Sequence, residues 1–228
     1  LDPRGRHAVL QNRQRVLTGS VRQLDPFYPI LPDTDWLKRL LPAGLKLVQL
    51  RIKDAPADVI RRQIEDAIRL CKQADCQLVV NDYWQLAIDA GADFVHLGQE
   101  DLANADIRAI RRAGIKLGIS THSDEELDIA LSANPDYVAL GPIYPTLLKK
   151  MPWAPQGLER VATWKAKVPC PLVAIGGITP DRARLVLEAG ADSLAVITDI
   201  LTHEAPERRA EAWMKLTGPG RRRRASLT

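Results

Sequence analysis

The segment VNDYWQLAIDAGADFVHLGQED, residues 80–101, contains the pattern that decides the fold. An apolar run ends at Asn81 and Asp82, a helical stretch follows, and Gly91 separates that stretch from a second apolar run at 93–97. A glycine in this place can adopt the left-handed conformation that ends a helix. Strand, helix and strand in this order predict a β-α-β unit, in which the two strands are parallel.

The same alternation extends along most of the chain. The sequence Ala-Gly-Ala-Asp recurs at 189–192, again between a helical stretch and an apolar run. Helical spacing is found at 58–74, 105–113, 123–133 and 180–189, and strand-like runs at 27–31, 46–50, 77–80, 93–97, 116–120, 136–140, 171–175 and 193–197. Eight strands alternating with helices predict a (β/α)8 TIM barrel. The alternative is an open doubly wound sheet, but no GxGxxG motif opens the first helix.

Length and composition indicate an ordinary globular protein. Of the 228 residues, 46% are apolar and 26% are charged, and barrels of this size form one domain. No apolar run approaches the roughly 20 residues that span a bilayer, and the basic N-terminus has no apolar signal region. Three cysteines, an odd number, argue against a disulfide framework. We therefore expect a cytoplasmic protein without a membrane partner.

Both ends of the chain fall outside the barrel pattern. We expect an arm or extra helix at 1–23, a catalytic TIM-barrel domain at 24–217, and a basic, disordered tail at 218–228. The net charge of +4 includes four arginines at 221–224. Such a run can bind nucleic acid, but no aromatic residues or recognition motif accompany it, so we expect no nucleic-acid partner. The oligomeric state is left open, and a homo-oligomer is compatible with the sequence.

Polar residues follow most of the predicted strands, at the end where barrel enzymes place their active sites. Arg51 and Lys53 are two residues apart and face the same side of an extended chain. Both side chains suit phosphate oxygens. Asp82 and Asp101 follow neighbouring strands, and carboxylates with phosphate oxygens are typical ligands of Mg²⁺. The alternatives are a surface cation pair and an Asp82 that caps its helix.

A second phosphate site is predicted across the barrel mouth. Gly176, Gly177 and Thr198 follow the seventh and eighth strands, where these barrels commonly bind phosphate through backbone N–H groups. Two such sites indicate two phosphorylated substrates, although a single bisphosphate also suits the pattern. His122 is a candidate general base. The preferred alternative is a residue that orients its own loop, because no carboxylate partner is evident from the sequence.

Six motifs resemble the thiamine-phosphate synthase family. They occur in family order and read QLRIKD, VNDYWQLAIDAGADFVHLGQEDL, GISTHS, DYVALGPIYPT, APQGLERV and VAIGGI. The resemblance implies a transferase that joins 4-amino-2-methyl-5-(diphosphooxymethyl)pyrimidine to a thiazole phosphate, giving thiamine phosphate and diphosphate. The family mechanism is dissociative: diphosphate leaves a pyrimidine-methyl cation, which the thiazole nitrogen captures.

The resemblance also implies roles for individual residues. Charge stabilisation during catalysis would come from Arg51, Lys53 and Lys149, and one Mg²⁺ per active site would bind Asp82 and Asp101. The pyrimidine diphosphate would be bound by Gln49, Leu50, Arg51, Ile52, Lys53, Asn81, Ser120 and Lys149. The thiazole phosphate would be bound by Thr146, Leu147, Leu148, Gly177, Ile197 and Thr198.

Two positions depart from the family pattern. Leu148 stands where the loop commonly has threonine, and one lost hydrogen bond costs about 0.5–1.5 kcal/mol. Thr198 replaces the usual serine and keeps the hydroxyl. Whether the natural acceptor is a carboxylated thiazole stays open. The rival hypotheses are a thiazole tautomerase of the same fold, with a proton-transferring histidine placed like His122, and a ligand-binding or nucleic-acid-associated protein whose active site has decayed. The paired aspartates and cations disfavour the tautomerase. Leu148 and the basic tail are the evidence for a decayed site, and the completeness of the motifs disfavours it.

Overall fold

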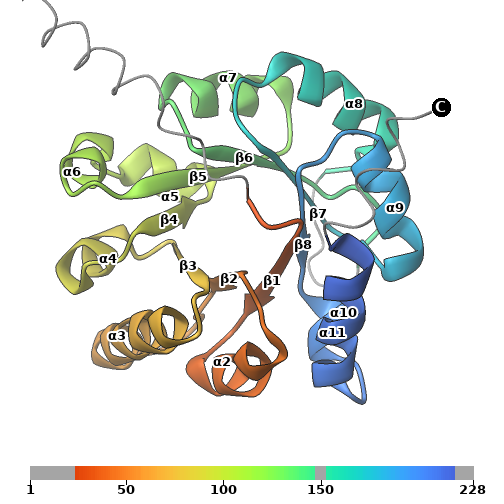
Figure 1. The fold of residues 1–228 in the computed structure, drawn as a ribbon. Coiled ribbons are helices and arrows are strands. Elements are labelled where there is room, and N and C mark those ends of the chain that lie inside the picture. The colour runs from red at the N-terminus through yellow and green to blue at the C-terminus, as the bar shows by residue number, and fades with distance from the viewer. Residues whose placement is uncertain (1–23, 147–152, 219–228) are drawn as a thin grey trace, which may run out of the picture.

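Eight parallel strands form a closed barrel in the computed structural model, which describes residues 24–146 and 153–218. Each strand pairs with its neighbour in sequence, and β1 closes the ring by pairing with β8. Figure 1 shows the strands at the centre and the helices around them. The strands are β1 (Phe27–Leu31), β2 (Leu47–Leu50), β3 (Gln77–Asn81), β4 (Phe94–Leu97), β5 (Lys116–Thr121), β6 (Tyr137–Leu140), β7 (Leu172–Ile175) and β8 (Ser193–Val196). The predicted barrel and its eight strands are confirmed.

Helices connect the strands on the outside of the barrel. They are α2 (Thr34–Leu40), the 3-10 helix η1 (Leu41–Ala43), α3 (Ala57–Gln73), α4 (Trp84–Ala90), α5 (Gln99–Asn104), α6 (Ile107–Arg112), α7 (Asp124–Ser132), α8 (Gly157–Lys167), α9 (Pro180–Glu188), α10 (Thr198–Leu201) and α11 (Pro206–Thr217). The helices predicted at 58–74, 123–133 and 180–189 are confirmed as α3, α7 and α9. The stretch predicted at 105–113 is α6, and the short α5 before it was not predicted. No helix in the described part of the chain is long and apolar enough to cross a membrane.

Glycines end the helices at the repeated Ala-Gly-Ala-Asp joints, as predicted. Gly91 has φ of 71° and Gly190 has φ of 112°. After the first of them, the Ala92 N–H donates to the Ala87 carbonyl at 2.9 Å, which closes the helix end over the left-handed residue. The chain is thereby turned directly into the next strand.

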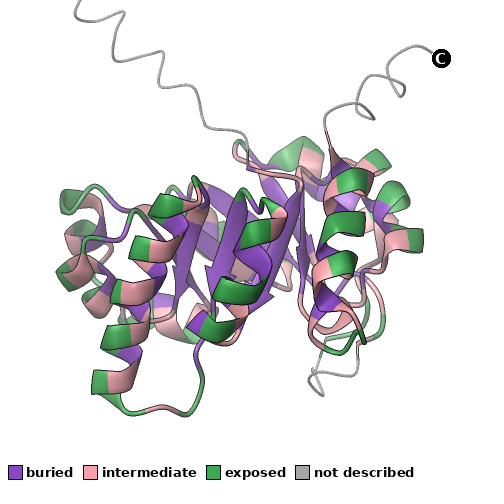
Figure 2. Ribbon diagram, turned by 60° about the horizontal axis from the view of Figure 1, so that its bottom comes forward, coloured by how far each residue is buried: buried purple, intermediate pink, exposed green. Residues whose placement is uncertain are grey.

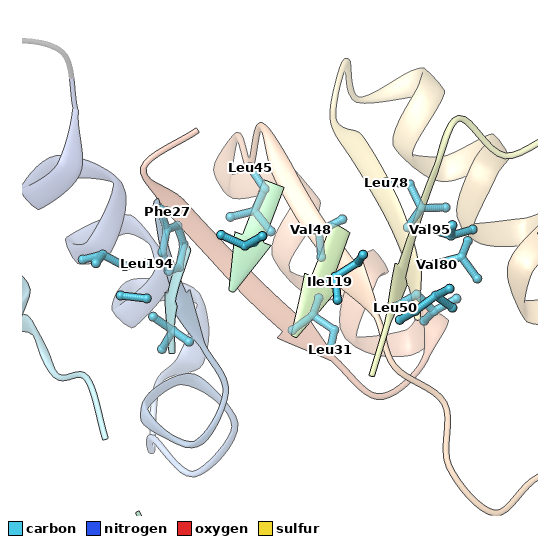
Figure 3. Packing of buried hydrophobic residues seen from close by; sticks show 14 of the residues in the cluster. Phe27, Leu31, Leu45, Val48, Leu50, Leu78, Val80, Val95, Ile119 and Leu194 are labelled. Atoms are coloured by element: carbon cyan, nitrogen blue, oxygen red, sulfur yellow. The ribbon is translucent and has the colours of Figure 1, made fainter. Parts of the chain in front are cut away.

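The barrel contains two hydrophobic cores, because successive strand residues face opposite sides. Val48 and its equivalents pack between the strands and the helices, where Figure 3 shows Phe27, Leu31, Leu50, Val80, Val95 and Ile119 among the contacting side chains. The inward residues form a separate cluster that includes Tyr28, Val79, Phe94, Tyr137 and Val173. Figure 2 shows the consequence: the strands are buried, and the exposed residues lie on the outer faces of the helices and in the loops.

Some predictions concern residues outside the described ranges. They are the N-terminal arm at 1–23, residues 219–228 of the basic tail, and three loop residues assigned to substrate binding, Leu147, Leu148 and Lys149. These assignments, and the domain boundaries with them, stay predictions.

Candidate active site

The carboxyl end of β2 brings two cations to the rim of the barrel. Gln49 is buried inside the barrel and Leu50 packs in the outer core. Beyond the strand the alternation continues, so that Arg51 and Lys53 are exposed whereas Ile52 between them is buried. The Lys53 ammonium lies 2.8 Å from a carboxylate oxygen of Asp82, which follows β3. Side chains that follow two neighbouring strands, β2 and β3, therefore meet at the rim.

Asp82 does not cap the helix that follows it, so that alternative is wrong. The residue has φ of 66°, and its N–H donates to the His96 carbonyl at 2.9 Å. Helix α4 begins two residues later, at Trp84, with Tyr83 at its N-cap position and no side-chain cap. The unusual backbone conformation directs the Asp82 side chain to Lys53 instead, and only 17% of that side chain is exposed.

Asp101 shares this part of the rim with Asp82. It lies in the first turn of α5, whose N-cap is Gly98. Burial and the adjacent Asp82 carboxylate raise the pKa of Asp101, against the opposing charge of Lys53. Within residues 24–146 and 153–218 no three His, Cys, Asp or Glu side chains are grouped to hold a metal. Two neighbouring carboxylates suit a cation such as Mg²⁺, which takes its remaining ligands from water and phosphate.

A chain of buried hydrogen bonds crosses the barrel interior below the rim. Gln49 Nε2 donates to the Tyr28 hydroxyl at 3.0 Å, and this hydroxyl lies 2.9 Å from that of Tyr137. The Tyr137 hydroxyl lies 2.7 Å from His96 Nδ1, and His96 Nε2 lies 2.7 Å from Ser120 Oγ. The chain thus joins two predicted substrate residues, Gln49 and Ser120, through three residues that were not predicted to belong to the site.

Burial at the centre of this hydrogen-bond chain favours the uncharged forms of its side chains. Burial lowers the pKa of His96 to about 4, with a further contribution from Arg51 and opposition from Asp82. Burial likewise raises the pKa values of Tyr28 and Tyr137. Asn81, also predicted to bind substrate, is buried at the end of β3 opposite His96. The two tyrosines could have been found from the sequence, since both occupy inward positions in the strand alternation.

His122 has the carboxylate partner that the sequence did not reveal. The Glu126 carboxylate oxygen Oε2 accepts from the backbone N–H of His122 at 2.7 Å. The same oxygen lies 2.8 Å from Nδ1 of the His122 imidazole. The imidazole also stacks on Trp153, with ring centroids 5.7 Å apart. Ser123 caps α7 by accepting from the Glu126 N–H at 3.2 Å, and the Glu126 side chain turns to His122 rather than to Ser123. These local contacts, with a bond from Gln156 Nε2 to the His122 carbonyl at 3.0 Å, fit a His122 that orients its loop, but the Glu126 carboxylate is also a partner that a general base would use.

The loops after β6 and β7 lie against each other on the opposite side of the rim. The Tyr144 N–H donates to the Gly176 carbonyl at 3.0 Å. Gly177 has φ of 64°, and a Cβ on it would lie 2.5 Å from the Pro145 carbonyl oxygen. Only glycine fits such a close approach. The structure thereby brings Gly177 next to the loop that leads to Thr146.

Ile197 and Thr198 lie at the beginning of α10, directly after β8. The following residue, Asp199, fastens this short helix to α11. Its carboxylate accepts from Arg209 at 2.8 and 2.7 Å and from Trp213 Nε1 at 2.7 Å. Ile197 and Thr198 therefore directly precede a residue that bonds α10 to Arg209 and Trp213 of α11.

Known proteins with similar sequences share one activity. A family model described as thiamine monophosphate synthase matches residues 28–200. A thiamine-phosphate synthase from Rhizobium etli is 62% identical over 200 residues, which cover 87% of this chain and 98% of that protein. One from Neisseria meningitidis is 46% identical over 191 residues, covering 83% and 93% of the two chains.

Solved structures agree with the sequence relatives. A thiamine phosphate pyrophosphorylase from Pyrococcus furiosus superimposes with a TM-score of 0.77 at 30% identity, covering 87% of this chain and 98% of that one. The 3-hexulose-6-phosphate synthase of Salmonella typhimurium, with a TM-score of 0.60 and 15% identity over 84% of this chain and 98% of that one, shares the fold alone.

Proposed function

The chain belongs to the thiamine-phosphate synthase family and is a transferase of thiamine biosynthesis, and we propose that the residues at its barrel mouth bind and couple two phosphorylated substrates. The substrates are 4-amino-2-methyl-5-(diphosphooxymethyl)pyrimidine and a thiazole phosphate, and the products are thiamine phosphate and diphosphate. The observation that carries the proposal is the convergence of Lys53, Asp82 and Asp101 on one part of the rim.

The β2 side of the mouth binds the pyrimidine diphosphate. Arg51 and Lys53 are exposed on the same side of the chain, so their charges can meet the diphosphate oxygens. Lys149, from the loop after β6, adds a third cation. The remaining contacts come from the main chain of 49–53 and from the side chains of Gln49 and Asn81, which are buried, and of Ser120, which is half-buried.

Asp82 and Asp101 would hold one Mg²⁺ together with the diphosphate. Burial and the adjacent Asp82 carboxylate raise the pKa of Asp101, and a bound cation would offset both effects, which supports this assignment. When bound, the cation neutralises negative charge on the leaving diphosphate. Lys53 already pairs with Asp82, so it lies where it can turn from that carboxylate to a phosphate oxygen.

The opposite side of the mouth binds the thiazole phosphate. Gly177 adopts a left-handed conformation beside the loop that leads to Thr146, and Ile197 and Thr198 begin α10. This arrangement supports a phosphate held by backbone N–H groups. Leu147 and Leu148 complete the set through the loop that contains them, without the side-chain hydroxyl that is usual in the family at Leu148.

The reaction needs charge stabilisation and exclusion of water rather than a protein nucleophile. The CH₂–O bond of the pyrimidine substrate breaks and its electron pair leaves with diphosphate. Arg51, Lys53 and Lys149 stabilise the growing negative charge. The thiazole nitrogen then donates its lone pair to the pyrimidine-methyl cation, which forms the new C–N bond. We also place this reaction in the cytoplasm, consistent with Cys71, Cys76 and Cys170 being free thiols.

The test supplies both substrates with Mg²⁺ and measures diphosphate and thiamine phosphate in the same samples. We expect equal amounts of the two products, and at least a roughly 100-fold loss of turnover for Asp82→Ala and Asp101→Ala. Asp35→Ala removes a carboxylate of an exposed pair with Lys38 and serves as the control, with turnover unchanged. Near-normal turnover of both site variants at limiting Mg²⁺ would refute the metal assignment.

A further inference from the structure

The orientation of the Gln49 amide, with Nε2 toward Tyr28, sets one direction for the inner chain of hydrogen bonds. The Tyr28 hydroxyl accepts from Gln49 Nε2, and its own hydrogen has one remaining acceptor among the described residues, the hydroxyl of Tyr137. Tyr137 must then give its hydrogen to His96 Nδ1. Nδ1 is therefore the acceptor, the imidazole proton lies on Nε2, and Nε2 donates to Ser120 Oγ. A hydroxyl hydrogen without a hydrogen-bond acceptor in this buried interior would cost about 1–3 kcal/mol.

This direction decides what the two ends of the chain can offer to a ligand. Gln49 has committed its amide N–H₂ group to the interior, so its free atom is the acceptor Oε1. Ser120 accepts from His96, so its own O–H is free to donate. Gln49 Oε1 is not among the sealed side-chain polar atoms without a partner in the described part of the chain, where Arg160 Nε alone is of that kind. Reversing the chain would exchange both properties together.

We propose that Tyr28, Tyr137 and His96 are positioning residues that fix Gln49 as a hydrogen-bond acceptor and Ser120 as a donor, and thereby select the aminopyrimidine ring. The inference rests on the proposed function, in which Gln49 and Ser120 bind the pyrimidine substrate. An aminopyrimidine presents an amino donor and a ring-nitrogen acceptor, which match in kind an acceptor at Gln49 and a donor at Ser120. A pyrimidinone, with a carbonyl acceptor beside a ring N–H donor, presents the opposite pattern.

The packing around Tyr137 supports a built site rather than a chance contact. Gly118, on the neighbouring strand, leaves the space that the Tyr137 ring fills, since a Cβ there would lie 2.1 Å from the ring carbon Cζ. The ring is also in contact with Phe94, at 5.5 Å between centroids, and stacks on the His96 imidazole at 5.5 Å. Its hydroxyl is therefore held at one place between Tyr28 and His96.

The test measures discrimination rather than activity alone. The value of kcat/KM is determined for the aminopyrimidine diphosphate and for its 4-oxo analogue, and their ratio is compared between the wild-type protein, Tyr137→Phe and Tyr28→Phe. Each substitution removes one hydroxyl and interrupts the chain, which frees the Gln49 amide to turn. We expect the ratio to fall at least about tenfold in both variants. Using the change in the ratio removes the intrinsic difference in reactivity between the two substrates.

Phe94→Leu is the matched control, because it alters the packing against Tyr137 without removing a hydrogen-bonding group. A merely structural role would lower kcat/KM for both substrates by the same factor and leave the ratio unchanged in all variants, which would overturn the proposal. If the wild-type protein forms no thiamine phosphate from the aminopyrimidine, the proposed function itself fails.

A second measurement needs no turnover. The protein contains four histidines. The ¹⁵N signals of the His96 imidazole can be assigned because they are lost in His96→Gln. We expect the neutral tautomer of His96 with the proton on Nε2 at pH 7. A proton on Nδ1 would mean that the chain runs in the opposite direction and would overturn the assignment.

Discussion

Gly118→Ala adds one methyl group at the described glycine where a Cβ would meet the shortest contact. The added methyl group would lie 2.1 Å from Cζ, 2.3 Å from Cε1 and 2.6 Å from the hydroxyl oxygen of Tyr137. Carbon atoms in contact are separated by about 3.5–4.0 Å, so the ring must move by more than about 1 Å. A movement of that size breaks the hydroxyl contacts with Tyr28 and His96.

The magnitude follows from three contributions. Overpacking costs about 1–3 kcal/mol, and the two lost hydrogen bonds cost about 1 kcal/mol each. Replacing glycine restricts the unfolded chain and returns about 0.4–1 kcal/mol. The free energy of unfolding should therefore fall by about 2–5 kcal/mol, which denaturation in urea can measure with an unchanged m-value.

A double-mutant cycle separates this cause from a general effect of alanine in β5. Tyr137→Leu removes the ring carbons that the new methyl group meets, so Gly118→Ala should cost less than about 1 kcal/mol in that background. Equal costs in the wild-type and Tyr137→Leu backgrounds would refute the reasoning, because the clash would then not be with Tyr137. A cost below about 1 kcal/mol in the wild-type protein would refute it as well.

Three further predictions concern the same molecule. Folding holds the pKa of His96 near 4, against 6.5 for a free imidazole, so the unfolded protein binds this proton first as the pH falls. Between pH 7 and pH 5 the wild-type protein should therefore lose about 2 kcal/mol more stability than His96→Gln. Urea denaturation at each pH measures this difference. A flat difference across that range would contradict the shift. Asp199→Ala leaves Arg209 and the Trp213 N–H without their partner and should destabilise the protein by about 3–5 kcal/mol in thermal or chemical unfolding, with a raised KM for the thiazole phosphate, whereas unaltered stability would show that the cluster does not fasten α10. Leu148→Thr restores the hydroxyl usual in the family and should lower the KM for the thiazole phosphate by about two- to tenfold with little change in the KM for the pyrimidine diphosphate; no change would remove the role assigned to this position.

The sequence by itself determined the barrel and the identity of most rim residues. Strand alternation and the glycine at each repeated joint are local properties, since the 2-residue period and the left-handed φ of Gly91 depend on neighbouring residues alone. In a closed parallel barrel all strands end at one rim. For that reason Arg51, Lys53 and Asp82 could be assigned to one place from their positions after β2 and β3.

The tertiary structure decided which side chains meet. Lys53 pairs with Asp82 across 29 positions, and Tyr28 meets Tyr137 across 109. Contacts at such separations depend on the register between strands and on the closure of the ring, which no local pattern encodes. Closure also turned Gln49 and Ser120 from two independent polar residues into the ends of one hydrogen-bond chain. Their donor and acceptor properties are therefore decided by the barrel interior, because each buried hydroxyl has a single hydrogen to give.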